Sequence, residues 1–192
     1  MKRFLTIPLY LVILSLFSSC GYNTMVQQQE GVEAAWAQVD VQYQRRNDLI
    51  GNLVETVKGY AKYEQETLTK VVEARASATQ VVVKADQLTE ENIQKYQAAQ
   101  GQLTSALSKL MAITENYPNL KADQGFSDLR AELSGTENRI AVARRDFNAA
   151  VQTYNTTIQT FPNNMMAGTF GFEKKGYFKS DAGSEKAPTV KF

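Results

Sequence analysis

The sequence predicts an all-α protein, and three observations carry that prediction. Apolar residues recur at steps of three and four through most of residues 27–161, a spacing that places them on one face of a helix. No segment alternates apolar and polar residues with the period of two that is typical of a strand. The connections between the helical segments are short, which favours antiparallel neighbours packed at shallow angles in a bundle.

The first helical segment is long and has a glycine near its middle. As one helix from Gln27 to Lys84 it would extend about 85 Å, whereas the next segment would reach only about 40 Å. Gly51 followed by Asn52 and Glu55 resembles a helix end and a new capping box. The apolar positions nevertheless stay in phase across Gly51, which favours a kinked helix instead. We therefore expect a stretch that is kinked or split near Gly51. Its apolar face comprises Val32, Trp36, Val39, Tyr43, Ile50, Leu53, Val57 and Tyr60.

Two more helical segments follow the first. Thr89 precedes two glutamates and has the character of an N-cap. Pro118 cannot continue a helix and ends the second segment. The third segment is the most regular, with an apolar residue at every seventh position. These positions are Phe126, Leu133, Ile140, Phe147, Tyr154 and Phe161.

The N-terminus differs in character from the rest of the chain. Lys2 and Arg3 precede a short apolar run, and small residues then lead to Cys20, the only cysteine. This arrangement fits a signal peptide over residues 1–19 that ends at a bacterial lipobox, although Phe17 stands where that pattern usually has leucine. We expect a lipidated N-terminus and tether over residues 20–26 and membrane attachment through acylated Cys20. The alternative is an uncleaved signal anchor with an incidental cysteine.

The composition argues against several functional classes. The sequence has no histidine and one cysteine, so the usual zinc sites and histidine-based nucleophiles cannot form. We expect no metal, no cofactor and no enzymatic activity. The formal net charge of +1 gives no general attraction to nucleic acid, and none is expected as a partner.

Two short clusters pair arginines with a nearby acid. One interpretation is an anion clamp, because guanidinium groups match phosphate and carboxylate geometry. The other is a polar layer inside the bundle, where arginine stems cover apolar surface and their heads meet acids. The candidate residues are Arg45, Arg46, Asp48, Arg144, Arg145 and Asp146.

The segment over residues 162–179 is apolar and contains glycines. It is too apolar for a free tail, so it either folds back to cap the bundle over residues 27–161 or presents a partner surface. Residues 180–192 are expected to form a flexible tail. The candidate surface residues are Met165, Met166, Phe170, Phe172, Tyr177 and Phe178.

Four stretches together resemble the LemA family of bacterial envelope proteins. They are YQRRNDLIGNLVETVKGYAKYE, ALSKLMAITENYPNLKAD, LSGTENRIAVARRDFNAAVQTYNTTIQTFP and GFEKKGYF. The resemblance covers nearly all of the chain after Cys20 and implies an antiparallel four-helix bundle outside the cytoplasm, with no catalytic residues to transfer. Gly51 stands where the family typically has proline, and Tyr63 where it has histidine.

These observations define two functional hypotheses. The first is a LemA-like, lipid-anchored scaffold or interaction module of the cell envelope, facing away from the cytoplasm, with an envelope protein or a second copy of itself as partner. The second is a small-ligand or glycan binder with a groove lined by tyrosine and arginine. Tyr43, Tyr117 and Tyr154 are the tyrosines that would line such a groove.

Overall fold

The computed structural model describes residues 2–60 and 64–180, with side chains described from Gly21 onward. Within these ranges all regular structure is helical, so the prediction of an all-α protein is confirmed for the described part of the chain. The elements are α1 (Lys2–Tyr60), α2 (Gln65–Gln80), the 3₁₀ turn η1 (Ala85–Gln87), α3 (Glu90–Thr114), α4 (Pro118–Lys121), α5 (Gln124–Gln159) and α6 (Asn164–Ala167).

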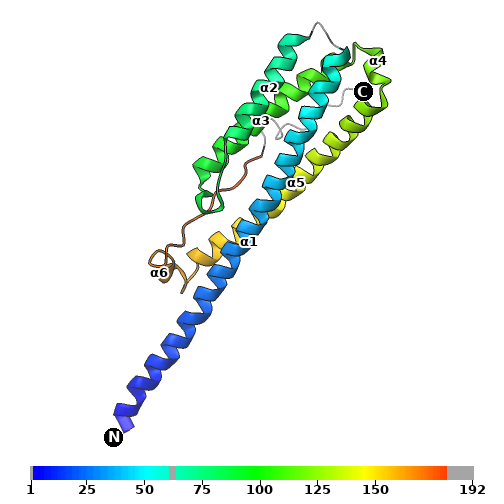
Figure 1. Cartoon of the computed structure of the whole chain (residues 1–192). Coiled ribbons are helices and arrows are strands. Elements are labelled where there is room, and N and C mark those ends of the chain that lie inside the picture. Colours follow the sequence, from blue (N-terminus) through cyan, green and yellow to red (C-terminus); the bar gives the residue numbers. More distant parts are fainter. Residues whose placement is uncertain (1, 61–63, 181–192) are drawn as a thin grey trace, which may run out of the picture.

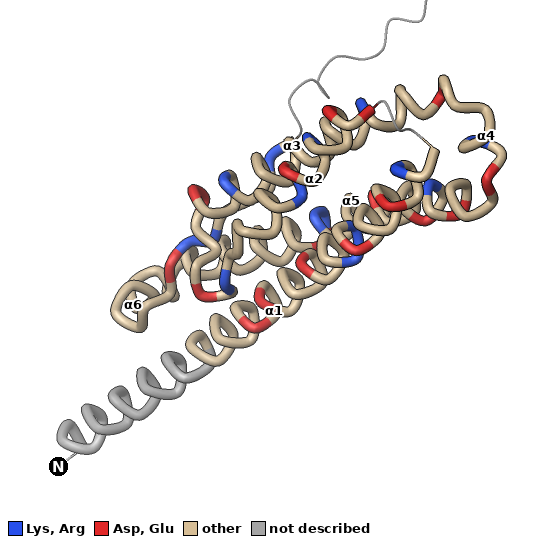
Figure 2. The backbone as a smooth tube through the Cα atoms, turned by 45° about the horizontal axis from the view of Figure 1, so that its top comes forward, with Lys and Arg blue, Asp and Glu red and all other residues tan. Residues whose placement is uncertain are grey.

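Two long helices form the spine of the molecule. α1 and α5 lie side by side and run in opposite directions, and the shorter helices α2 and α3 pack together beside them (Figure 1). After α6 the chain turns back and lies along the body as an extended segment (Figure 1). Basic and acidic residues are interspersed along the helices in Figure 2, which fits the near-zero net charge.

The apolar side chains form two clusters along the length of the molecule. The first contains Trp36, Tyr43, Tyr96, Phe147 and Tyr154 and joins α1, α3 and α5 to the C-terminal segment. The second joins α1, α2, α3 and α5 near α4 and is mainly aliphatic. The seven-residue positions of the third predicted helix are buried from Phe126 to Tyr154, whereas Phe161 lies beyond α5 and is exposed.

Side-chain caps fix the starts of α3 and α5. The hydroxyl of Thr89 accepts a hydrogen bond from the Asn92 amide, which confirms the predicted N-cap. Asp123 caps α5 by accepting from the Phe126 amide at 2.8 Å, and its other oxygen accepts from the Tyr60 hydroxyl at 2.8 Å. Both bonds favour the ionised carboxylate, and together they hold the pKa of Asp123 below its usual range.

Asp123→Asn should remove the contribution that the ionised Asp123 carboxylate makes to the free energy of unfolding. A carboxylate with a depressed pKa in the folded state stabilises the fold above its unfolded pKa, and this contribution is lost as the pH falls through the folded value. The wild-type protein should therefore exceed the variant in stability at pH 7, and the difference should shrink below about pH 4. Urea unfolding at several pH values measures this difference. If the difference in free energy of unfolding between the wild type and Asp123→Asn does not change with pH, the charge of Asp123 does not stabilise the fold and the loss is due to packing alone.

Helix α1 continues through Gly51, so a split at this position is wrong. The helix ends at Tyr60, and α2 begins at Gln65. The Arg75 side chain packs beside this glycine, and a Cβ at Gly51 would lie 3.4 Å from the Arg75 guanidinium, an ordinary van der Waals contact. Arg75 donates from Nε to the Asn47 carbonyl at 2.8 Å and thereby joins α2 to α1.

Gly51→Ala should stabilise the protein by about 0.5 to 1 kcal/mol. Alanine removes the entropic penalty of a helical glycine, and the Arg75 head can shift slightly to accept a methyl group. Gly101→Ala in α3 is the matched control, since a Cβ there meets nothing within 4 Å and should give a similar gain. Chemical denaturation measures both. A clear loss at Gly51 alone would indicate a helix break that only glycine accommodates.

Several N-terminal predictions lie outside the described side chains. These are the signal peptide, the lipobox and Cys20; Tyr63 lies in the gap before α2. Residues 21–26 belong to α1, and Met25 continues its apolar stripe and is fully buried, whereas the tether over residues 20–26 stays a prediction. Among the residues that the structure describes, none of the helices has a stretch long and apolar enough to cross a membrane.

Candidate functional site

A layer of buried polar side chains separates the two apolar clusters. Arg46 and Asn47 come from α1, Gln100 from α3 and Thr136 from α5, and each is less than 8% exposed. Burial of polar groups is costly unless they find hydrogen-bond partners. In this layer the main donor of hydrogen bonds is the Arg46 guanidinium.

Arg46 joins three helices through its guanidinium group. Nη1 donates to Thr104 Oγ1 and to Glu137 Oε1, both at 3.1 Å, and Nη2 donates to the Gln100 side chain. The group also lies over the Tyr43 ring, with Cζ 4.8 Å from the ring centroid. Nε is buried and has no hydrogen-bond partner in the described part of the chain. One side chain thus connects α1, α3 and α5 in the middle of the body.

A cleft of about 520 Å³ opens beside this layer, between α1, α3 and α5. Its lining includes an aromatic ring, two arginines and several amide or hydroxyl groups. Such a mixture can hydrogen-bond a polar ligand and stack against one of its faces. The principal lining residues are Tyr43, Arg46, Gln97, Gln100, Glu137 and Arg144.

The predicted arginine–acid clusters do not form a single clamp. Arg46 and Arg144 both line the cleft, but Arg45 pairs with Glu132 on the exposed surface. Arg145 pairs with its neighbour Asp146 at 3.0 Å, and both are largely exposed. Asp48 is also exposed. The cause is helical geometry, because consecutive residues point about 100° apart around the axis.

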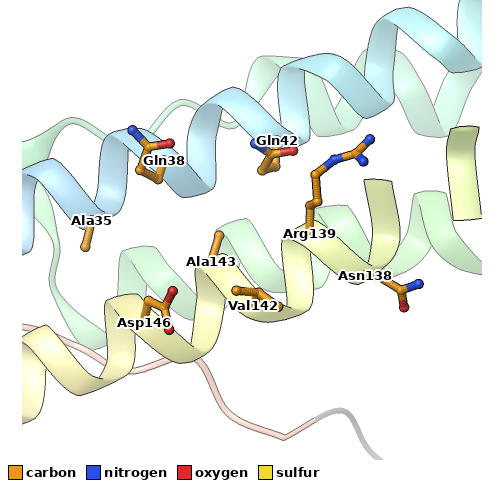
Figure 3. A pocket seen from close by; sticks show the side chains of 8 residues that line it. All are labelled: Ala35, Gln38, Gln42, Asn138, Arg139, Val142, Ala143 and Asp146. Atoms are coloured by element: carbon orange, nitrogen blue, oxygen red, sulfur yellow. The ribbon is translucent and has the colours of Figure 1, made fainter. Parts of the chain in front are cut away.

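Asp146 borders a different hollow, of about 400 Å³, between α1 and α5. Figure 3 shows the small side chains of Ala35 and Ala143 in the space between these two helices. Gln42 also lines it, and the Oε1 atom of Gln42 is buried without a partner among the described residues. The hollow exists because the side chains of Ala35 and Ala143 are too small to fill the space between the two helices.

The three predicted groove tyrosines lie in different places. Only Tyr43 lines the cleft. Tyr154 is fully buried in the first cluster, where burial raises the pKa of its hydroxyl. The Tyr117 hydroxyl donates to Glu64 Oε1 at 3.2 Å, near the second cluster. The heptad spacing therefore predicted the burial of Tyr43 and Tyr154 correctly, but Tyr117 is only half-buried and the three tyrosines share no groove.

Asp40 is a partly buried carboxyl group whose pKa is raised by desolvation, an effect partly offset by its hydrogen bond from the Tyr96 hydroxyl. A raised pKa can mark a catalytic acid when the group faces a cleft. Asp40 is not among the residues that line either hollow. In the ranges 21–60 and 64–180, no group of three acidic, histidine or cysteine side chains could hold a metal ion.

The candidate partner residues near the C-terminus divide into two sets. Phe172 and Phe178 are buried and belong to the first apolar cluster. Met165 is 72% exposed and Phe170 54%, and Tyr177 is also exposed, whereas Met166 is half-buried. Sequence reasoning grouped all six because they are apolar. Tyr177 and Phe178 are consecutive in the extended segment after Gly171 and therefore point to opposite sides of it, whereas Met165 and Met166 lie in α6 and Phe170 in the turn that follows.

The fold and its clefts define an all-helical protein in which two long helices carry a central polar layer and a C-terminal segment folded back on them. The profile of the LemA family matches residues 35–192. The chain belongs to the LemA family.

Individual relatives agree with this assignment. Magnetosome protein MamQ 2 of Paramagnetospirillum magneticum is 30% identical over 175 residues, which cover 82% of this chain and 64% of that protein. Magnetosome protein MamQ of Magnetospirillum gryphiswaldense is 29% identical with the same coverage. Protein LemA of Metamycoplasma hominis is 25% identical over 145 residues, which cover 76% of this chain and 63% of that protein. The chain thus spans less than two thirds of the length of each relative.

Proposed function

We propose that this chain is a lipid-anchored, non-enzymatic interaction module of the bacterial cell envelope. In this proposal α1, α2, α3 and α5 act as an antiparallel four-helix bundle, acylated Cys20 holds the bundle to the membrane, and the body faces away from the cytoplasm. Membership of the LemA family and the N-terminal apolar run that leads to Cys20 support this assignment.

An exposed apolar surface next to the expected anchor is the observation that carries the proposal. Tyr22 lies two residues after Cys20, and its ring contacts that of Phe170 at 5.1 Å between centroids. The same part of α1 packs against the loop before α6, where the Asn163 side chain fills the space that a Cβ at Gly21 would occupy. The exposed side chains here are Tyr22, Phe161, Met165 and Phe170. We call these four residues the anchor-side patch.

Aromatic residues at one end of a protein are suited to a membrane interface, where part of the ring is apolar and part remains wet. A lipid on Cys20 would hold the anchor-side patch against the membrane surface. The ionisable groups, in contrast, serve the fold: Arg46 bonds across three helices and Asp123 caps α5. This use of charges favours a structural over a catalytic role.

Mass spectrometry of the protein from its native membranes tests the anchor. The expected mature chain begins at an acylated Cys20, and Cys20→Ser should abolish acylation and processing. An intact Met1 in the wild-type protein would contradict lipid anchoring.

An environment-sensitive fluorophore tests the orientation. We expect the emission of a fluorophore attached at Phe170→Cys to shift to shorter wavelength when the protein is bound to membranes, compared with the same protein in solution without membranes or detergent. A label at Asn119→Cys, in α4 at the far end, is the matched control and should not shift. Equal spectra at the two positions would contradict a membrane-facing anchor-side patch. Cross-linking from position 170 in intact envelopes then tests whether a protein also binds at this end.

The cleft beside Arg46 favours a second candidate function, the binding of a small polar ligand or glycan. The proximity of Tyr43, Arg46 and Arg144 in a cleft of about 520 Å³ supports it. Gly101 lines the same cleft with open space around it, so Gly101→Leu should fill it. We expect N-acetylglucosamine oligomers to bind the wild type and Gln102→Leu, an exposed neighbour outside the cleft, but not Gly101→Leu. Equal or absent binding in all three proteins would reject this function for that class of ligand.

A further inference from the structure

The segment from Phe172 to Ser180 lies in extended conformation along the body, after the turn at Gly171, whose φ is +77°. We call this segment the strap. Figure 1 shows it running back from α6 alongside the helices. It contacts side chains of α3 and α5 and, through the Leu88 carbonyl, the main chain just before α3. Side-chain amides of these helices form hydrogen bonds with its backbone.

Two asparagines on α5 bind the strap in the same way. Asn155 accepts from the Lys175 amide at 2.9 Å and donates to the Lys175 carbonyl at 2.8 Å. Asn148 accepts from the Phe178 amide and donates to the Phe178 carbonyl, both at 2.9 Å. The two asparagines lie seven residues apart and so on the same face of the helix. Each satisfies both hydrogen-bonding groups of one strap residue, as a neighbouring strand would.

A third amide completes the set from α3. Gln97 donates to the Lys179 carbonyl at 2.8 Å and accepts from the Lys179 amide at 3.0 Å. Arg144 of α5 also donates to the Lys179 carbonyl at 2.9 Å. The strap is therefore held from two helices through bonds that do not depend on its side chains.

Aromatic contacts anchor the strap in the core. Phe178 is 5% exposed; its ring stacks on Trp36 at 6.0 Å between centroids and meets Phe147 edge-on at 5.5 Å. The Arg144 guanidinium covers the same ring, with Cζ 5.0 Å from its centroid. The position of Phe178 thus corresponds to a specific side-chain pocket.

Gly176 is the point of closest approach between strap and body. Its amide donates to the Leu88 carbonyl at 2.8 Å. A Cβ at this position would lie 2.5 Å from the Glu90 Cα and 2.9 Å from the Thr89 carbonyl carbon. Those neighbours are backbone atoms and cannot move aside cheaply. The site therefore requires glycine two residues before the anchoring aromatic residue.

Main-chain bonds that give affinity, with pockets that give specificity, are the features by which proteins bind extended peptides. We propose that Gln97, Asn148, Asn155 and the Phe178 pocket form an extended-peptide-binding site, which the strap fills within its own chain and which the strap of a second copy fills by exchange. All the recognised features belong to the strap itself, so the site does not distinguish its own strap from that of another copy. The glycines at 168 and 171 precede the strap and provide the backbone freedom that exchange requires.

The inference deepens the proposed interaction role by naming a second copy as partner. Within one chain the strap has a high effective concentration, so the closed monomer should predominate for the wild type in dilute solution. Exchange between two chains should become detectable when neither chain can bind its own strap in its own site. Two full-length variants meet this condition. In the acceptor, Gly176→Val disables the strap but keeps the site; in the donor, Asn148→Ala with Asn155→Ala disables the site but keeps the strap.

Analytical ultracentrifugation of differently labelled donor and acceptor tests the exchange. Each variant alone should remain monomeric, and their mixture should form a one-to-one complex. Phe178→Ala in the donor is the control and should abolish the complex, because it removes the anchoring ring. A mixture that stays monomeric, with both variants helical by circular dichroism, would overturn the proposal.

A second measurement covers the case in which the donor fails to fold. A synthetic peptide of residues 170–181 is added to the acceptor, and the fluorescence of Trp36, the only tryptophan, reports occupation of the pocket. The acceptor should respond and saturate, and the wild type should respond far less. Absence of a response in the folded acceptor would overturn the proposal. Both tests use purified protein, so their failure would leave the membrane-anchor results unaffected.

Discussion

Arg46→Ala should lower the free energy of unfolding by about 3 kcal/mol, the low end of the range for breaking a buried ion pair. The substitution leaves the Gln100 side chain without its bond from Arg46 and removes the partner of Glu137. It also opens space beneath Tyr43. The Glu137 side chain is 39% exposed and can regain water, which is why we expect the low end. Urea denaturation measures the loss.

The neighbouring arginine provides a matched control. Arg45 has the same side chain on the same helix, but its side chain is 53% exposed and pairs with Glu132 at the surface. Arg45→Ala should change stability by less than about 1 kcal/mol. Arg46→Met, which restores volume without hydrogen bonds, should fall between the two alanine variants. Equal effects of Arg45→Ala and Arg46→Ala would contradict the account of the polar layer.

Phe147→Ala should cost about 3 to 5 kcal/mol, as is typical of a large cavity in a packed core. Phe147 is fully buried, and its ring meets Trp36 and Phe178 edge-on, each at 5.5 Å between centroids. The substitution therefore removes contacts within the body and contacts to the strap together. Thermal and urea unfolding should both show the loss, and Trp36 fluorescence should shift as its surroundings loosen.

Val142→Ala tests whether the effect at Phe147 depends on burial. Val142 lies on the same helix but is 47% exposed, so its truncation should change stability by less than about 0.5 kcal/mol. A loss at Phe147 as small as that at Val142 would indicate that the first apolar cluster does not hold the body together.

The sequence pattern was sufficient to predict the helical class and most of the core. The residues Val32, Trp36, Val39 and Tyr43 were assigned to one face of the first helix, and all are buried. Periodicity identifies such faces because one side of a helix meets the core. It also identified the N-cap at Thr89, since capping depends on residues close in sequence.

Features that depend on distant residues escaped the sequence analysis. Gly51 suggested a helix break, but it lies within α1, and the Arg75 side chain of α2 packs beside it and donates to the Asn47 carbonyl. The actual end of α1 at Tyr60 is not marked by proline or by a left-handed glycine. Short-range capping rules therefore suggested a possible boundary at Gly51, whereas α1 ends at Tyr60.

The strap-binding amides were also missed, for a physical reason. Asparagine and glutamine have no charge or apolar periodicity that would distinguish Asn148, Asn155 and Gln97 from other surface residues. The one available signal was that Asn148 and Asn155 lie seven residues apart on α5, beside Phe147 and Tyr154. Its meaning depends on where the C-terminal segment lies, which local sequence rules do not specify.

Hydrogen exchange of the strap amides tests most directly whether the strap occupies a binding site on the body. In the full-length protein, we expect slow exchange at Lys175, Phe178 and Lys179, whose amides donate to Asn155, Asn148 and Gln97. In Gly176→Val the same amides should exchange far faster while the amides of α5 remain protected. Fast exchange of these three amides in the wild type, at the rate found in the variant, would contradict the account.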